Sequence, residues 1–309
     1  MQISIGISVK GSRTSAPLGA SFTSTWTTTG LSETIELPYL STGSTYSGTI
    51  DWGDGNTSVN SYTNRTHTYA TAGTYTVIIT GDCTGWDFGV YEGSIFITSV
   101  VNWGQLQLGT ANAGYNFYNC PNLDLSSVQG TLNLTGVTNF KGLFYSCYTL
   151  TTINNINSWD TSAVTDMGSM FASCSSFNQP LSFNTAAVTD MSSMFVFCSS
   201  FNQPLSFNTA EVTDMSGMFY EAITFNKNIG SWDVANVTNF LNFMDGITFE
   251  TFSPTNLDAI YNGWSASGVK PNINISFGSA RFTNAGGLVG KNILLGAQNN
   301  WTIADGGGV

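Results

Sequence analysis

The sequence predicts a mainly β protein in which a small antiparallel β-sandwich precedes a solenoid of stacked coils that ends in a small α/β cap. One unit is written three times between residues 161 and 233, and its first two copies, 161–184 and 185–208, share 20 of 24 positions. Short alternating strands separated by Gly-containing turns fill residues 22–81. One apolar stripe at helical spacing begins after Ser253. We therefore expect four segments: an arm at 1–20, a sandwich at 21–82, a solenoid at 83–253 and a cap at 254–309.

The first segment is rich in Ser and Gly and holds one alternating apolar run from Ile3 to Val9. We expect a free terminus or an edge strand there, and docking of residues 1–30 onto a larger assembly is the alternative. The second segment predicts strands because apolar residues alternate between Gly-Asp-Gly and Ala-Gly turns. These strands are expected at 22–27, 34–37, 46–52 and 74–80.

Two stretches of the sandwich carry a family resemblance: residues 51–55 (DWGDG) and residues 67–77 (HTYATAGTYTV). Together they closely resemble the polycystic-kidney-disease (PKD) domain. The resemblance implies an immunoglobulin-like sandwich that has no chemistry of its own and serves as a spacer or adhesion module. Asp51 and Asp54 are expected to fix the turn by accepting backbone amide hydrogens, and a weak Ca²⁺ site is the alternative. His67, the one histidine of the sequence, has no Ser or Cys partner and is expected to be structural.

Within one clean coil, residues 188–191 are predicted to form a short strand with Val and Met inward and Thr and Asp outward. A helical or 3₁₀ turn is then expected from Ser192, capped by Asp190 or by Ser192 itself. Residues 201–205 are expected to return along the convex side, where Pro204 excludes a central ladder position. The less regular residues 83–133 are expected to start the stack, because terminal coils must end the core.

Four of the five cysteines take the same place in successive coils, and Ala222 takes that place in the third copy. A place that accepts Ala is predicted to be a small buried slot. Stacked coils put equivalent residues roughly 4.8 Å apart with parallel side chains, which is a poor geometry for a disulfide. We expect reduced packing thiols, with a disulfide or a metal site as the alternatives. The four are Cys120, Cys147, Cys174 and Cys198.

The candidate ligand-binding residues form an outward ladder of Thr-Asp pairs: Thr165, Asp166, Thr189, Asp190, Thr213 and Asp214. Carboxylates repeating at roughly 4.8 Å would repel unless each accepts amide hydrogens or shares a cation. The simplest expectation is that each Asp caps the turn of its own coil, and a row that binds a sugar, a protein or an ion is the alternative. Glycosidase chemistry requires two carboxylates in different environments, whereas repetition gives these the same one. We therefore predict no catalytic residues.

Three further series repeat with the coils. Asn178, Asn202 and Asn226 are expected to satisfy turn amides as a structural stack. The methionines of the repeat are expected to fill the core. The aromatic series is expected to pack inside, with a sugar-stacking platform as the alternative. The two core series are Met167, Met170, Met191, Met194, Met215 and Met218, and Trp159, Phe183, Phe207 and Trp232.

The repeat, VTDMSxMFxxCSSFNQPL, strongly resembles the leucine-rich repeats of BspA-type bacterial surface proteins, including their mycoplasma-type version. The resemblance covers residues 134–253, more loosely 83–133, and the terminal stretches 257–264 and 300–307. It implies surface-exposed adhesion or recognition. The chain departs from exported members at its beginning, because residues 1–15 lack the basic start and apolar stretch of a secretory signal.

The cap is predicted to begin with a helix over 254–266. Ser253 or Thr255 can cap it, Pro254 suits its first turn, and an apolar stripe follows at helical spacing. That stripe is expected to cover the open end of the last coil. It comprises Leu257, Ile260, Tyr261 and Trp264. Strands are expected at 272–277 and 301–304 around a weak helix at 285–297.

Composition narrows the function. Only 9% of the residues are charged, the net charge is −11, and the eight Lys and Arg residues are scattered singly. Nucleic-acid binding requires clustered cations and is disfavoured. Nowhere does an apolar run approach the roughly 18 residues that cross a bilayer, so we expect no membrane insertion. A surface-type protein without an export signal points to a particle that is released by lysis, such as a phage virion.

We therefore expect a non-enzymatic, surface-exposed adhesion or recognition module at a virion surface or in the extracellular space, as a tail, fibre or head-decoration protein. A structural assembly protein anchored by its N-terminal arm and a bacterial cell-surface adhesin are the alternatives, and a depolymerase is a distant third. The expected partners are a host-surface glycan or protein and, through residues 1–30, other virion proteins. No cofactor is expected beyond the Ca²⁺ alternative, and the oligomeric state is left open, a homo-oligomer included.

Overall fold

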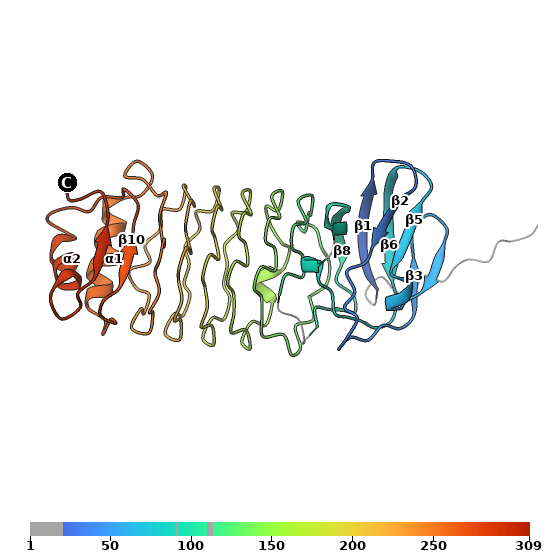
Figure 1. Ribbon diagram of the computed structural model, residues 1–309, viewed down its shortest axis with the longest axis horizontal. Coiled ribbons are helices and arrows are strands. Elements are labelled where there is room, and N and C mark those ends of the chain that lie inside the picture. The colour runs from blue at the N-terminus through green and yellow to red at the C-terminus, as the bar shows by residue number, and fades with distance from the viewer. Residues whose placement is uncertain (1–20, 91, 110–113) are drawn as a thin grey trace, which may run out of the picture.

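The computed structural model describes residues 21–90, 92–109 and 114–309, and the predicted arm at 1–20 lies outside these residues. The described chain is mainly β with few helices. Sheets lie at one end of an elongated molecule, a row of coils fills its middle, and helices close the other end (Figure 1). Consecutive coils lie side by side along the long axis, so sequence order is also spatial order.

The N-terminal part contains two sheets, a five-stranded one and a two-stranded antiparallel one. The larger sheet has the order β4-β3-β6-β1-β8 and consists of β1 (Phe22–Thr28), β3 (Thr49–Asp51), β4 (Thr57–Val59), β6 (Gly73–Ile79) and β8 (Ile97–Asn102). The smaller sheet pairs β2 (Glu33–Glu36) with β5 (Thr66–Tyr69). Of the stretch predicted as a strand at 46–52, only β3 is a regular strand, and the prediction is too long there. Short 3₁₀ helices lie at Tyr62–Asn64, Phe88–Val90, Glu92–Ile95 and Ile156–Ser158.

Strand β8 joins the sheet to the stack. It pairs antiparallel with β1, through Thr25 and Ser99 among others, and Ser99 also forms a parallel bridge to Asp124 of the first coil. β7 (Cys83–Thr84) pairs in parallel with β9 (Leu106–Gln107), which in turn bridges to Asn133. The aromatic core is equally continuous: ring centroids lie 4.9 Å apart for Phe22–Trp86, 6.3 Å for Trp86–Phe117 and 5.8 Å for Phe117–Phe144. The predicted boundary between 82 and 83 stays a prediction, and hydrogen bonds and packing both cross it.

Equivalent residues of successive coils lie one above another. Parallel bridges connect Asn139 to Asp166, Asp166 to Asp190, Asp190 to Asp214 and Asp214 to Asn239. A file of buried phenylalanines repeats with ring centroids 5.8 Å apart for Phe171–Phe195 and for Phe195–Phe219. In the quartet 188–191, Val and Met are buried and Thr is exposed, as predicted. The expected strand itself is absent, because the extended backbone of each coil shrinks to a single bridge before the chain turns.

The predicted helical or 3₁₀ turn after the quartet is half right. Met194 and Val196 donate their N–H groups to carbonyl oxygens three residues back, as in a 3₁₀ helix, but the alternate residues Ser193, Phe195 and Phe197 donate to the next coil. Two of these three donors are left-handed, Ser193 (φ +55°) and Phe197 (φ +58°). A continuous helix would keep the hydrogen bonds of those N–H groups within one coil. In the structure these groups bond to the next coil instead, so no continuous helix forms.

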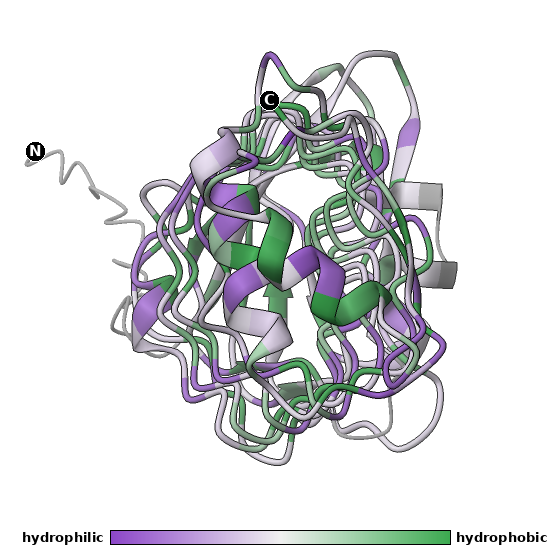
Figure 2. Cartoon of the chain, turned by 90° about the vertical axis from the view of Figure 1, so that its left-hand side faces the viewer, coloured by the Kyte–Doolittle hydropathy of each residue, from purple (hydrophilic) through white to green (hydrophobic). Residues whose placement is uncertain are grey.

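The C-terminal cap follows the prediction closely. It contains α1 (Pro254–Ser265), β10 (Asn274–Ser276), α2 (Leu288–Leu295) and β11 (Thr302–Ala304), with β10 and β11 parallel. The four apolar residues of the predicted stripe are buried, and the helices lie across the end of the stack (Figure 2). Ser253 is the N-cap residue of α1 and Thr255 lies inside its first turn, but Ser253 makes no side-chain capping bond, so only the position of the expected cap is confirmed. A Cβ on Gly263 would lie 1.9 Å from the carbonyl oxygen of Gly230, so α1 approaches the last coil through a pair of glycines.

None of the described helices is long and apolar enough to cross a membrane.

Candidate functional site

The threonines of the predicted ladder form a hydrogen-bonded row. The backbone N–H of Thr165, Thr189 and Thr213 each donates over 2.8 Å (N···O) to the carbonyl oxygen of the threonine one coil earlier. Their hydroxyl groups donate to the same oxygens over 3.3, 3.2 and 3.1 Å. The side chains are exposed, but their hydroxyl hydrogens are engaged within the stack. The row therefore offers a ligand acceptor lone pairs and no free donor.

The aspartates of the ladder, Asp166, Asp190 and Asp214, lie half-buried beside the threonines. In each, Oδ1 accepts the backbone N–H two residues further along the chain, over 2.8 Å. This is the turn-fixing role that the sequence predicts for the carboxylates. Asn139 and Asn239 occupy the same place in the flanking coils and accept the same bond through their amide oxygens. The place thus requires an acceptor and does not require a charge.

Repetition brings like charges together in this row. Partial burial raises the pKa of the Asp166 carboxyl above its usual value; the N–H bond from Gly168 acts the other way, and the neighbouring charge of Asp190 raises the pKa further. At the end of the row, Nδ2 of Asn239 donates to Oδ2 of Asp214 over 2.9 Å. Among the described residues, no three His, Cys, Asp or Glu side chains converge in a way that would hold a metal ion. The structure therefore brings all six predicted residues into one row, and the contacts that it gives them are internal.

The asparagine series is a second internal row. Oδ1 of Asn178 accepts the backbone N–H of Asn202 over 2.9 Å, and Oδ1 of Asn202 accepts that of Asn226 over 3.0 Å. Oδ1 of Asn226 then accepts the N–H of Ser253 over 2.9 Å, which extends the row into the cap. The predicted structural role is confirmed, with the detail that each amide oxygen serves the next coil and not its own turn.

The cysteines are free and buried, as predicted. The thiols of Cys147, Cys174 and Cys198 lie 3.2, 3.0 and 2.9 Å (Sγ···O) from carbonyl oxygens of preceding coils. Burial raises the pKa of the Cys83 thiol to about 12. The repeat methionines are also buried, and the aromatic series Trp159, Phe183, Phe207 and Trp232 is at most 7% exposed, which confirms interior packing and leaves no sugar-stacking platform there.

The turn at 51–55 behaves as predicted. Oδ1 of Asp51 accepts the N–H of Gly53, and Oδ1 of Asp54 accepts that of Asn56, both over 3.0 Å. Oδ2 of Asp54 lies 2.8 Å from Nε2 of His67, whose ring stacks on Trp52 at 4.9 Å between centroids. Desolvation raises the pKa of Asp54, but the hydrogen bonds from His67 and Asn56 outweigh it and hold that pKa below its usual value. These contacts support the structural reading of His67.

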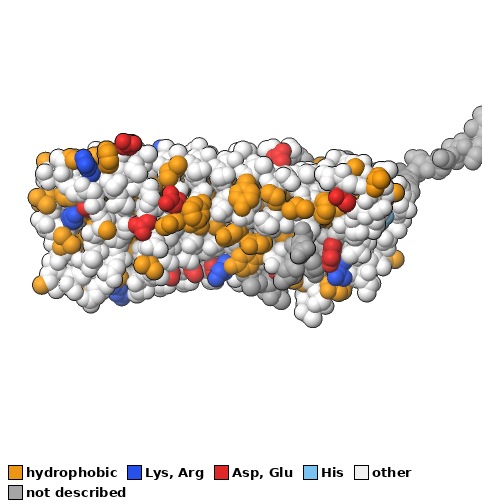
Figure 3. All heavy atoms as spheres, turned by 45° about the horizontal axis from the view of Figure 1, so that its top comes forward, with side chains coloured by type: hydrophobic (Ala, Val, Ile, Leu, Met, Phe, Trp, Pro, Cys, Tyr) orange, Lys and Arg blue, Asp and Glu red, His pale blue; other side chains and the backbone are white. Residues whose placement is uncertain are grey.

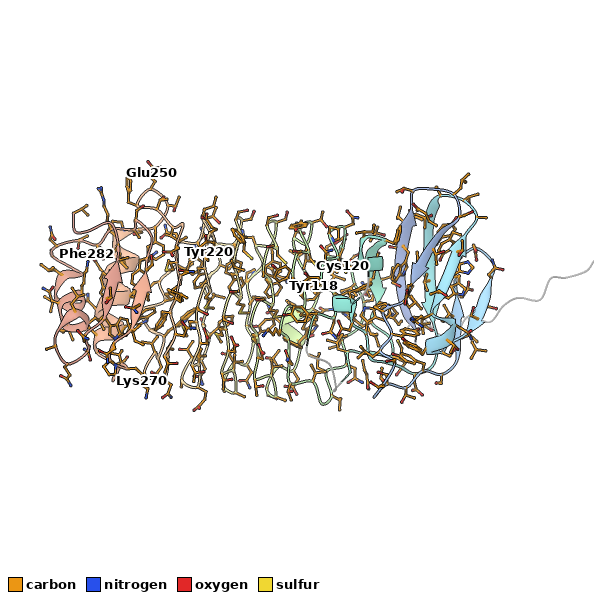
Figure 4. The ribbon with its side chains drawn as sticks, in the orientation of Figure 1. Tyr118, Cys120, Tyr220, Glu250, Lys270 and Phe282 are labelled. Atoms are coloured by element: carbon orange, nitrogen blue, oxygen red, sulfur yellow. The ribbon has the colours of Figure 1, made fainter. Side chains whose placement is uncertain are left out.

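Sequence reasoning missed a surface feature of the coils. Apolar side chains form a row along one visible face of the molecule (Figure 3). Phe197 is 50% exposed and Leu241 is 61% exposed, and they line a cavity of about 350 Å³ together with Tyr220. A second cavity of about 390 Å³ is lined by Tyr115, Tyr118, Tyr145 and Gly89. Figure 4 labels Tyr118 and Tyr220, one from each cavity, on separate coils.

A signal for this surface was present in the repeats. The two clean copies differ at only four places, and two of these are adjacent: Ala172 and Ser173 in the first copy become Val196 and Phe197 in the second. In the third copy the same places hold Tyr220 and Glu221. Ala172 is buried, but the other residues at these two places are half-buried or exposed. The variation between copies therefore marks a part of the surface where different coils carry different side chains.

Stacked coils of one repeated unit define a mainly β repeat protein, with a sheet-bearing part before the stack and a helical cap after it. The family described as "Mycoplasma protein of unknown function, DUF285" matches residues 112–207, 138–258 and 182–284. These matches together span residues 112–284, which is 173 of the 309 residues, and the chain belongs to this family. No curated protein and no solved structure matches the chain.

Proposed function

We propose that this protein is a non-enzymatic, surface-exposed recognition module in which a PKD-like sandwich presents a leucine-rich-repeat-like solenoid of the BspA type. One observation carries the proposal. The polar residues that repeat through the stack each make the same bond to backbone groups: threonine hydroxyls to the preceding coil, aspartates to their own turn and asparagines to the next coil. The repeated polar residues of such a stack have uniform surroundings and form no pair of unlike neighbours of the kind that general acid and base catalysis uses.

The proposed setting is a virion surface, where a tail, fibre or head-decoration protein meets a host-surface glycan or protein. The low share of charged residues supports an extracellular or particle surface, because Ser, Thr and Asn carry the solubility. An anchor to other virion proteins is proposed for residues 1–20 only. The rest of the stretch 1–30 is largely β1, which already pairs on both sides with β6 and β8 and has no free edge to offer.

The test uses the purified full chain, because β8 pairs with β1 and a fragment beginning at 83 would lose that contact. The chain is applied to host cells and to a glycan array, and reducing-sugar release is measured in the same wells. Attachment without sugar release is the expected result. Sugar release would overturn the non-enzymatic proposal, and failure to attach to any surface would overturn recognition.

A matched variant separates recognition from assembly. The chain that begins at Ser21 leaves every described strand in place, so it is expected to attach to host surfaces as well as the full chain does. Incorporation into particles is expected to fall, because the proposed anchor is missing. Normal incorporation with lost attachment would place the recognition surface in the removed arm.

A further inference from the structure

Phe197 is the one aromatic residue among the described residues that share its left-handed place in successive coils. It occupies a left-handed position (φ +58°), which disfavours large side chains. The residues at the same place in other coils are Asn119, Ser146, Ser173 and Glu221, also left-handed (φ +53°, +59°, +60° and +56°). Burial does not compensate for the Phe, because half of its surface is exposed. A bulky residue held in a disfavoured conformation with its ring in solvent points to a role in binding.

The ring of Phe197 has a partner from the next coil. It meets the ring of Tyr220 edge to face, with centroids 5.4 Å apart and planes at 87°, and the backbone N–H of Phe197 donates to the carbonyl oxygen of Tyr220 over 2.8 Å. Leu241, from the coil after that, closes the cavity of about 350 Å³. That volume lies near the lower end of the range for small-molecule sites, which is roughly 300–1,000 Å³. It suits one ring of a ligand at a time.

The lining selects the chemistry of the ligand. The cavity is lined by two aromatic residues, by Val and Leu, by two serines and by Asn242, and none of the described lining residues is charged. The hydroxyl of Ser216 donates to Asp214, so Ser193 and Asn242 supply the polar groups of the lining. Apolar faces next to hydroxyl and amide groups match a neutral polyhydroxylated ring, which has apolar faces and a polar edge. An anionic sugar would find no cation in the lining and would approach a chain of net charge −11.

The second cavity repeats this chemistry on the same track of the stack. Tyr118, Tyr145 and Tyr220 occupy the same place in different coils, and none of the described residues that line the cavity of Tyr115, Tyr118 and Tyr145 is charged. Tyr145 and Tyr220 are three coils apart, which at ~4.8 Å per coil is ~14 Å. Two neutral aromatic cavities in line suit a chain of sugars better than a single one.

We propose that this face binds a neutral oligosaccharide along the stack, with one sugar seated against Phe197 and Tyr220 and further sugars reaching toward the tyrosine cavity. The proposal deepens the proposed recognition function and rests on it. It also moves the binding residues away from the Thr-Asp ladder, whose donors the stack itself uses. In this proposal Phe197 and Tyr220 stack against the sugar, and the side-chain amide of Asn242, which also lines the cavity, hydrogen-bonds to its hydroxyl groups.

The test compares binding of the full chain to neutral oligosaccharides of hexose and N-acetylhexosamine with binding to sialylated and sulfated ones. Phe197→Asn installs the residue type that Asn119 provides at the same left-handed place, and Tyr220→Val installs the residue type of Val196. Each is expected to weaken binding to the neutral oligosaccharides by at least about tenfold. The thermal unfolding midpoint of Phe197→Asn is expected to equal or exceed that of the wild type, because Asn tolerates the left-handed conformation, so lost binding would not reflect lost folding.

Two controls make the outcomes distinguishable. Ser173→Asn introduces the same side chain one coil earlier, outside the cavity, and is expected to leave binding unchanged, as is Asp190→Asn in the ladder. Binding that survives Phe197→Asn but is lost in Asp190→Asn would overturn this site and leave recognition standing. Attachment to host surfaces without any binding to neutral oligosaccharides would overturn the ligand class alone. Tighter binding to the sialylated or sulfated oligosaccharides would overturn the argument from charge.

Discussion

Asp190→Asn is expected to stabilise the stack at low ionic strength and to lose that advantage in high salt. Asp190 has a like charge one coil away on each side, because its ladder partners are Asp166 and Asp214. At the ~4.8 Å between ladder partners, each repulsion amounts to ~0.9 kcal/mol in a water-like dielectric. Two neighbours therefore oppose folding by roughly 1.7 kcal/mol before screening.

The substitution also weakens one favourable contact. Asn at 190 keeps an acceptor for the N–H of Ser192, as Asn239 does for its own turn, but the bond loses its charge and about 1 kcal/mol. The net gain in unfolding free energy is then about 0.5–1 kcal/mol at low salt. At about 1 M salt the screening length falls to ~3 Å, so the repulsion falls to about a fifth, ~0.3 kcal/mol, and the loss of about 1 kcal/mol outweighs it.

Urea unfolding at both salt concentrations measures this change of sign. Asp190→Ala, which removes the acceptor, is the control and is expected to be less stable than Asp190→Asn at both salt concentrations by about 1 kcal/mol. A variant Asp190→Asn that is most destabilised at low salt would refute the reasoning, because it would mean that the carboxylates share a bound cation. In that case the ladder would be an ion-binding row.

The charge of Asp190 also acts on the carboxyl of Asp166, one coil away. The pKa of Asp166 is raised in the folded protein, in part by Asp190, so the folded state binds this proton more tightly than the unfolded chain does. Ionisation of Asp166 therefore opposes folding as the pH rises from the usual pKa of a carboxyl to the raised one. Asp190→Asn is expected to lower the pKa of Asp166, which an NMR titration of that carboxyl measures, and to flatten this loss of stability. An unchanged titration would show that Asp190 does not act on Asp166.

Three further predictions follow from the packing of the coils. Cys174→Ala is expected to change the unfolding free energy by no more than ~1 kcal/mol, because Ala222 fills the same slot in a later coil, and a loss measured in urea well beyond that would contradict the small-slot interpretation. Asn202→Ala is expected to cost ~1–3 kcal/mol and to speed hydrogen exchange at the N–H that its amide oxygen accepts, and an unchanged exchange rate would argue against the asparagine row. Gly263→Ala is expected to push α1 from Gly230 and to lower the thermal unfolding midpoint through overpacking of ~1–3 kcal/mol, whereas an unchanged midpoint would mean that the helix can shift without penalty.

The sequence was informative about everything that depends on the repeat period. Because each coil buries its apolar residues only against the next, the period identifies the inward valines, methionines and phenylalanines and the buried place of the cysteines. The buried stripe of α1 could be predicted for a different reason, because its apolar residues recur at helical spacing. The conformation between the inward residues of a coil could not, since the left-handed turns at Ser193 and Phe197 occur where the N–H groups bond to the next coil, a contact that the local sequence does not show.

Part of the candidate site could be predicted from the sequence, and part could not. That the aspartates fix turns could be predicted, because the acceptor and the N–H that it binds lie two residues apart in sequence. The aromatic cavity could not be predicted, because Phe197, Tyr220 and Leu241 come from three consecutive coils and occupy different places in them. Only the structure shows that they line one cavity. The differences among copies pointed to the place but not to the shape of the cavity.

The shared strand β8 determines how the molecule would carry a mechanical load. The strands of the five-stranded sheet and the coils all run across the long axis, so their hydrogen bonds point along it (Figure 1). A force that pulls the sheet end and the cap end of the molecule apart would load these rows of hydrogen bonds in series. The weakest row would then set the rupture force. Extension would then proceed by detachment of one coil at a time, and each detached coil would add the length of its own residues to the extended chain.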